Sequence, residues 1–219
     1  QNSGTGSSNT AVGNQSQLTN SSGSGNTSVG ACSLNDNTTA SDNTAVGSSA
    51  LESNTTGYAN TAVGIIALDA NTVGFHNTAI GANALTTAST GCRNTSMGYI
   101  SGTALTTGCN NTFLGYGAGM RTTTGICNIA IGSSAGCQNS PFHLTTQDNR
   151  IIMGNNATNA YIKVAWTVTS DLRDKTNFGT VPHGLDFVNK LEPVSFQFKK
   201  SREDDTPHGD VRYGFKAQD

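Results

Sequence analysis

Asn9-Thr10-Ala11-Val12-Gly13 is the first of eight copies of a five-residue motif that decides the fold. The copies follow one another every 17 residues, without insertion or deletion. Their asparagines are Asn9, Asn26, Asn43, Asn60, Asn77, Asn94, Asn111 and Asn128. The fourth residue is always large and apolar, from Val12 to Ile131, and the fifth is always Gly. Such a fixed period indicates a repeat architecture in which each copy occupies an equivalent position.

Each repeat is expected to form one rung of a parallel β-roll or β-solenoid. In an extended segment, alternate side chains face opposite sides, so the second and fourth motif residues share one face and the small third residue takes the other. A second short strand is expected at segments such as Ser49-Ala50-Leu51, and glycines such as Gly57 and Gly74 are expected to supply turns with positive φ. Stacked rungs would place the motif asparagines in a side-chain amide ladder. At about 4.8 Å per rung, eight rungs give a shaft of roughly 40 Å.

One large apolar side chain per rung makes a thin core. We therefore expect three chains to wrap together and share the apolar stripe, as a homotrimer. The many Gly and Ala residues favour close approach of the backbones at an axis. A monomeric solenoid is the alternative, and the oligomeric mass distinguishes the two.

Charge divides the chain into parts. Residues 1–147 contain six charged side chains, whereas the last 72 residues contain the other 20. The period breaks after Ala135, and Arg150-Ile151-Ile152-Met153-Gly154 is a degenerate copy five residues late. We therefore assign residues 1–137 to the repeat shaft, 138–168 to a neck with the last degenerate repeat and a linker strand, and 169–219 to a second domain.

Composition excludes several functional classes. A net charge of -2 without a basic cluster argues against nucleic-acid binding. No apolar run approaches the roughly 20 residues that span a bilayer, so we expect no membrane insertion. The five cysteines include no C-x-x-C pair, which argues against zinc, and we expect neither metal nor cofactor. Cys92 and Cys109 occupy the same position in adjacent repeats, where we expect buried free thiols rather than a disulfide.

The Asn-Thr-Ala-Val-Gly units followed by Ala-Leu resemble the head repeats of trimeric autotransporter adhesins and related repeats in phage and large-virus tail fibres. The resemblance covers about residues 1–135. It implies parallel β-rolls in a trimer that serve as spacers or adhesive surfaces.

The last domain resembles the C-terminal intramolecular chaperone of endosialidase-type tail spikes. Three blocks carry the resemblance, within residues 169–178, 184–198 and 212–219. It implies a domain that trimerises the chains, lets the fibre wind up, and then releases itself by autoproteolysis at or beside Ser170-Asp171. The family domain continues through further helical sequence, so we expect a small, incomplete α+β domain here.

The proposed catalytic dyad of that family corresponds by motif to Ser170 and Lys175. A serine hydroxyl becomes a good nucleophile when a base takes its proton, and lysine can be that base if desolvation lowers its pKa. The alternative interpretation is that Ser170 or Asp171 caps a short helix and Lys175 is solvated.

These observations predict a structural trimeric fibre or tail-spike protein of a virus or phage, on the virion surface and hence extracellular. Its expected partners are its own copies, other virion fibre or tail proteins, and a host surface glycan or protein receptor. A bacterial trimeric surface adhesin is the alternative, although an autotransporter would lead into a membrane anchor instead of the chaperone blocks. An enzyme acting in trans is disfavoured because the shaft shows no paired carboxylates, so autoproteolysis is the most that we expect.

The aromatic residues are interpreted as scattered surface or turn side chains. They are Tyr58, Phe75, Tyr99 and Tyr116.

Overall fold

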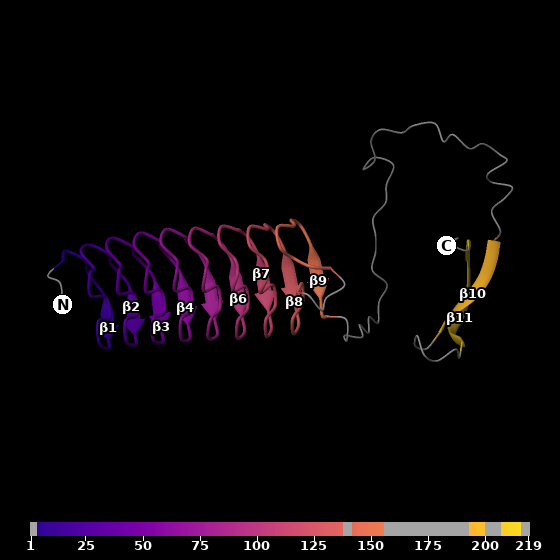
Figure 1. The fold of residues 1–219 in the computed structure, drawn as a ribbon, viewed down its shortest axis with the longest axis horizontal. Coiled ribbons are helices and arrows are strands. Elements are labelled where there is room, and N and C mark those ends of the chain that lie inside the picture. The colour runs from indigo at the N-terminus through magenta and orange to yellow at the C-terminus, as the bar shows by residue number, and fades with distance from the viewer. Residues whose placement is uncertain (1–3, 138–141, 156–192, 200–206, 216–219) are drawn as a thin grey trace, which may run out of the picture. The chain divides into compact units, whose positions relative to one another are not determined.

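The computed structural model describes residues 4–137, 142–155, 193–199 and 207–215. The chain divides into two compact units, Gln1–Tyr161 and Ile162–Asp219. The first unit contains nine three-residue strands and the second a two-stranded hairpin (Figure 1). The strands of the first unit are β1 (Thr10–Val12), β2 (Thr27–Val29), β3 (Thr44–Val46), β4 (Thr61–Val63), β5 (Thr78–Ile80), β6 (Thr95–Met97), β7 (Thr112–Leu114), β8 (Ile129–Ile131) and β9 (Ile151–Met153).

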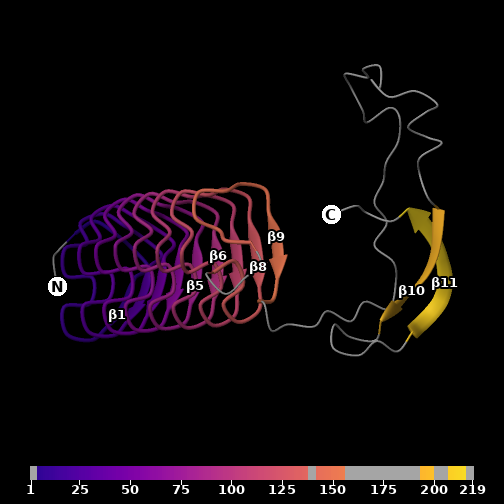
Figure 2. The ribbon, with the colours of Figure 1, turned by 45° about the vertical axis from the view of Figure 1, so that its right-hand side comes forward.

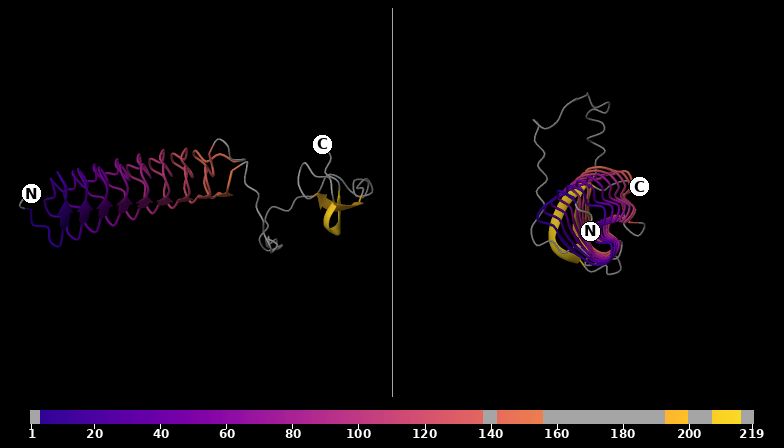
Figure 3. Two further views of the ribbon diagram at one scale, coloured as in Figure 1. Left: turned by 90° about the horizontal axis from the view of Figure 1, so that it is seen from below. Right: turned by 90° about the vertical axis from the view of Figure 1, so that its left-hand side faces the viewer.

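The nine strands form one parallel sheet in sequence order, β1 to β9. Neighbouring strands pair in register, so that Val12 lies opposite Val29 and Thr10 opposite Thr27. Seen along its length, the first unit is a stack of nearly superimposed rungs (Figures 2 and 3). The degenerate copy joins as the last strand, with Ile129 paired to Ile151. The prediction of an all-β fold with a parallel β-solenoid is confirmed.

The prediction of a second strand in each rung is wrong. The segment Ser49-Ala50-Leu51 is a turn, because Ser49 and Leu51 both have left-handed backbone with φ of 55° and 53°. Left-handed residues on both sides of Ala50 prevent an extended run. The turn still bonds to the next rung, since the Leu51 N–H donates to the Ala67 carbonyl at 3.0 Å.

The core lies inside the rungs and is built from small strand residues and leucines. The third motif residue points inward, as at Ala45, Ala62 and Ala79, all 0% exposed. Facing it is a second column that we call the core column. It consists of Gln17, Leu34, Leu51, Leu68, Leu85, Gly102, Gly119 and Gly136. The fourth motif residue lies on the outside, so the alternation of faces is confirmed, but the expectation that this aliphatic residue forms the thin core of each rung is wrong.

Core volume is kept where the core column lacks leucine. Phe113 replaces the small strand residue in β7 and is fully buried. A Cβ placed on Gly102 would lie 2.8 Å from Cδ2 of Phe113, and one on Gly119 would also collide with this ring. At the last rung, Leu144 fills the space beside Gly136 in the same way. One large side chain therefore fills the space that leucines occupy in other rungs.

The motif asparagines form a continuous buried ladder, as predicted. The Asn43 N–H donates to Oδ1 of Asn26 at 3.0 Å, and Nδ2 of Asn43 donates to the Gly57 carbonyl at 2.9 Å. The same backbone contact repeats from rung to rung and ends where the Arg150 N–H donates to Oδ1 of Asn128. A second ladder, absent from the sequence analysis, runs through Asn20, Asn37, Asn54 and Asn71. The ladders satisfy most of these buried polar groups, which would be costly to bury without a partner; among the described residues, Oδ1 of Asn71, at the end of the second ladder, has none.

Two kinds of glycine keep the rungs close together. The motif glycine Gly64 has a φ of +137°, a region open to Gly alone, and an added Cβ there would meet the backbone of Gly81 at 2.6 Å. Gly57 does not have the predicted positive φ; it is needed because an added Cβ would collide with the Gly74 carbonyl. The left-handed residue lies two positions later, at Ala59.

The described part of the second unit is an antiparallel hairpin. Strand β10 (Pro193–Lys199) pairs with β11 (Pro207–Phe215), and the register shifts between Phe196 and Phe198. The predicted linker strand at residues 161–168 lies outside the described residues.

Candidate functional site

The predicted dyad lies outside the part of the chain that the structure describes. Ser170 and Lys175 both fall within residues 156–192. Their role as nucleophile and base therefore stays a prediction from the sequence. The described sites all belong to the solenoid.

The outer face of the solenoid sheet carries an apolar column along its length. Its members, which we call the outer aliphatic column, are Val12, Val29, Val46, Val63, Ile80, Met97, Leu114, Ile131 and Met153. Val46 is 36% exposed, Leu114 43% and Val12 56%. Threonines of the second motif position share this face from β1 to β7. Because the column continues through nine rungs, it is a contiguous apolar surface rather than single exposed side chains.

The aromatic residues are paired across rungs, not scattered. The rings of Tyr58 and Phe75 stack with centroids 5.2 Å apart and planes 2° apart. His76 meets both rings edge-on, and the Arg93 guanidinium lies 5.2 Å from the Phe75 centroid. A second pair, Tyr99 and Tyr116, has centroids 5.9 Å apart. The members of each pair are 17 residues apart, so the repeat spacing would have revealed both.

The five cysteines are free, as predicted for Cys92 and Cys109. These two are only partly buried, however, and the Cys92 N–H donates to Sγ of Cys109 at 3.1 Å. Burial and the neighbouring Cys109 thiol raise the pKa of Cys92 to about 11, although Arg93 acts in the opposite direction. Burial also raises the pKa of the Cys137 thiol. A raised pKa makes these thiols poor nucleophiles at neutral pH.

One pair of carboxylates was missed in the sequence analysis. Glu52 and Asp69 occupy the same position in adjacent rungs, and the pKa of Asp69 is raised by burial and then by the charge of Glu52. The described residues contain no group of three or more His, Cys, Asp or Glu side chains that could hold a metal ion. Glu52 and Asp69 therefore repel each other at a local electrostatic cost and do not form a metal site.

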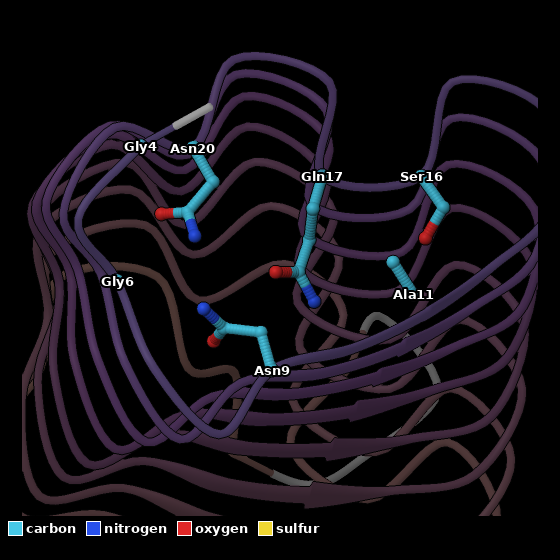
Figure 4. A pocket seen from close by; sticks show the side chains of 7 residues that line it. All are labelled: Gly4, Gly6, Asn9, Ala11, Ser16, Gln17 and Asn20. Atoms are coloured by element: carbon cyan, nitrogen blue, oxygen red, sulfur yellow. The ribbon is translucent and has the colours of Figure 1, made fainter. Parts of the chain in front are cut away.

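The first rung opens into a cavity of about 150 Å³ (Figure 4). The amide side chains of Asn9, Asn20 and Gln17 project into it. Gln17 takes the place that leucine has in the next four rungs, and its Nε2 donates to the Thr10 carbonyl at 3.0 Å. A polar group thus covers the first leucine of the core column.

No helix of the described segments is long and apolar enough to cross a membrane. The described part of the first unit is a parallel β-solenoid, in which each rung contributes one strand. Residues 170–219 match the model of the family described as chaperone of endosialidase. The match begins at Ser170 and includes Lys175, β10 and β11. It supports the prediction that the last domain is an intramolecular chaperone.

The other comparisons give no match. No curated protein and no solved structure is significantly similar to this chain. The resemblance of the shaft to tail-fibre and adhesin repeats accordingly stays a prediction.

Proposed function

We propose that this chain is the shaft and chaperone portion of a trimeric viral or phage fibre or tail spike, which projects from the virion toward host attachment. The observation that carries the proposal is the order of its parts. An in-register β-solenoid is followed along the chain by a segment that matches the chaperone of endosialidase. A repetitive β-structure with long stacking order needs its chains aligned at the start of winding, which is the task of such a chaperone.

The outer aliphatic column is the proposed contact between the three chains. A single chain leaves this column exposed, at 36% for Val46 and 39% for Met97. Packing of three such columns around a common axis would remove them from water at a gain of roughly 25 cal/mol per Å² of apolar area. The column would therefore add an apolar contact between the chains to the core that each rung already contains.

The proposed release step uses Ser170 as nucleophile and Lys175 as base, with cleavage at or beside Ser170-Asp171. The Ser170 hydroxyl attacks the carbonyl of the scissile peptide bond as its proton passes to the Lys175 amine. The tetrahedral intermediate then expels the peptide nitrogen, which takes this proton back from Lys175, and water hydrolyses the ester left on Ser170. Lysine is neutral enough for this only when desolvated, which assembly of three chaperone segments would bring about. Cleavage would then follow correct trimerisation. The remaining partners would be other virion fibre or tail proteins and a host surface receptor.

The trimer is tested by measuring the mass of the full chain in solution with light scattering. Wild type is expected at three times the chain mass of 22.5 kDa. Val63→Glu, in the middle of the outer aliphatic column, is expected to dissociate the trimer. Thr90→Glu is the matched control, because Thr90 is exposed on a turn away from the sheet and should leave the mass unchanged. A monomeric wild type, or a trimeric Val63→Glu variant, would contradict the proposed interface.

The release step is tested by intact mass of wild type beside Ser170→Ala and Lys175→Ala. Wild type expressed with its full C-terminus should lose a fragment that begins near residue 170, and both variants should keep it. Identical masses in all three proteins would refute the dyad.

A further inference from the structure

The stacked pair Tyr58 and Phe75 belongs to a column at one corner of the solenoid, which we call the corner column. Its members are Ser7, Ser24, Ser41, Tyr58, Phe75, Cys92, Cys109, Ile126 and Asp148. At four rungs, a side chain of this column accepts a hydrogen bond from the backbone N–H one rung earlier. These bonds are Ser7 to Ser24 at 3.1 Å, Ser24 to Ser41 at 3.0 Å, Cys92 to Cys109 at 3.1 Å and Ile126 to Asp148 at 2.7 Å.

The aromatic residues interrupt this series. The rings of Tyr58 and Phe75 present no lone pair at the place where a serine Oγ accepts, so the N–H groups of Ser41 and Tyr58 lose the side-chain acceptor that Ser7 and Ser24 have. Serine at positions 58 and 75 could accept these two backbone hydrogen bonds between rungs. The aromatic side chains therefore answer a requirement other than hydrogen bonding between rungs.

The stack is covered on one side only. Phe75 lies between the Tyr58 ring and the Arg93 guanidinium, each 5.2 Å from its centroid, whereas Tyr58 is 44% exposed. On the other side of Tyr58, the next member of the corner column is the small Ser41. The Tyr58 ring therefore has no ring stacked on it from the Ser41 side, which is where a further ring would continue the stack.

The rung on this side of Tyr58 carries two polar residues, Ser41 and Asp42. The Asp42 side chain is exposed, and its carboxylate lies near Gly25 of the preceding rung. The Ser41 oxygen accepts from Ser24, which leaves its own proton free to donate. A ligand for this place needs one apolar face for Tyr58 and hydroxyl groups at its edge for Asp42 and Ser41. A pyranose ring has both, since its C–H face packs on aromatic rings and its hydroxyls donate to carboxylates.

We propose that the free face of Tyr58, together with Ser41 and Asp42, is a binding subsite for a neutral pyranose of a glycan, such as a hexose or an N-acetylhexosamine. The inference builds on the attachment role proposed above and specifies the class of receptor. The sugar is neutral because the Asp42 carboxylate repels an acidic sugar, while Arg93 lies on the far side of Phe75 from the subsite.

The test is saturation-transfer NMR on the full chain, with the methyl glycosides of glucose, galactose, N-acetylglucosamine and sialic acid as probes. At least one neutral glycoside is expected to bind, with no binding of the sialic acid glycoside. Tyr58→Ser is the decisive variant, because serine extends the hydrogen-bonded series of Ser7, Ser24 and Ser41 and so preserves the rung. It should weaken binding at least tenfold. Tyr116→Ser, which removes a tyrosine of the other pair that is 54% exposed, should leave binding unchanged.

Three results would overturn the subsite. The first is that no neutral glycoside binds, and the second is that Tyr58→Ser binds as wild type does. The third is a lower oligomeric mass of Tyr58→Ser, which would show that the ring packs against another chain. Binding that survives Tyr58→Ser but is lost in Tyr116→Ser would refute this subsite and leave the attachment role standing. Mass and cleavage of the same preparations report on the fibre proposal independently.

Discussion

Truncation of Phe113 should show how the core keeps its volume. Phe113 is fully buried, and its ring occupies the space in front of Gly102 and Gly119. Phe113→Ala leaves this space empty and is expected to lower the free energy of unfolding by about 3–5 kcal/mol. The measurement is urea denaturation followed by circular dichroism, with the stability extrapolated to water.

Leucine at both glycines should partly restore the Phe113→Ala variant. Two buried leucines return roughly 1.5–3 kcal/mol each, and left-handed backbone costs about 1–2 kcal/mol per residue. The left-handed geometry is already present, with φ of 61° and 60° at Gly102 and Gly119, close to the 51° of Leu85. We therefore expect a recovery of about 1–2 kcal/mol. With Phe113 present, the same two leucines should destabilise the protein through overpacking. The reasoning is refuted if the leucines lower stability equally in both backgrounds.

Three further predictions concern single side chains. Asn60→Ala removes the acceptor for the Asn77 N–H and the donor to the Gly74 carbonyl, so it should lower the free energy of unfolding by about 3 kcal/mol in urea denaturation. Asn14→Ala is the control and should cost nothing measurable, because Asn14 is exposed. Equal losses of stability in the two variants would contradict the ladder. Asp69→Asn should stabilise the protein near pH 7 by about 0.5 kcal/mol, because it removes the repulsion from Glu52. The folded-state pKa of Asp69 is raised above 3.8, so this gain in stability should shrink as the pH falls through the raised pKa. Thermal unfolding of both proteins from pH 7 to 3 checks the trend. Iodoacetamide at pH 7.5 should alkylate Cys92 about a hundredfold more slowly than a thiol with the usual pKa of 9.0, as followed by peptide mass mapping. Labelling of Cys92 before the exposed Cys127 would contradict the raised pKa of Cys92.

The sequence predicted the features that follow from the 17-residue period. It did not predict the features that depend on left-handed backbone conformation. Spacing alone gave the rungs, the parallel register and the ladder through Asn60, because these follow from equivalent positions. It did not give the turn at Ser49-Ala50-Leu51, since left-handed φ at Leu51 is costly for a side chain with a Cβ and is imposed by the surrounding rungs.

The candidate sites also contain some features that the repeat spacing predicts and others that only the structure shows. Val63 was read as shared core from its size, and its outward direction appeared only once Ala62 was found inside. The stack of Tyr58 on Phe75 was available from their spacing, whereas the open layer at Ser41 needed the structure. Ser170 and Lys175 rest on motif alone.

In-register stacking also has an evolutionary consequence. Rungs pair with their immediate neighbours through the same backbone contacts, so an exchange between two copies of the gene segment that removes or adds 17 codons would leave the backbone pairing of the remaining rungs intact. The shaft could lengthen or shorten in steps of about 4.8 Å without a new fold. Phe113 sets one limit on this freedom. It fills space beside both Gly102 and Gly119, so an exchange within that stretch must carry all three residues together or leave a cavity.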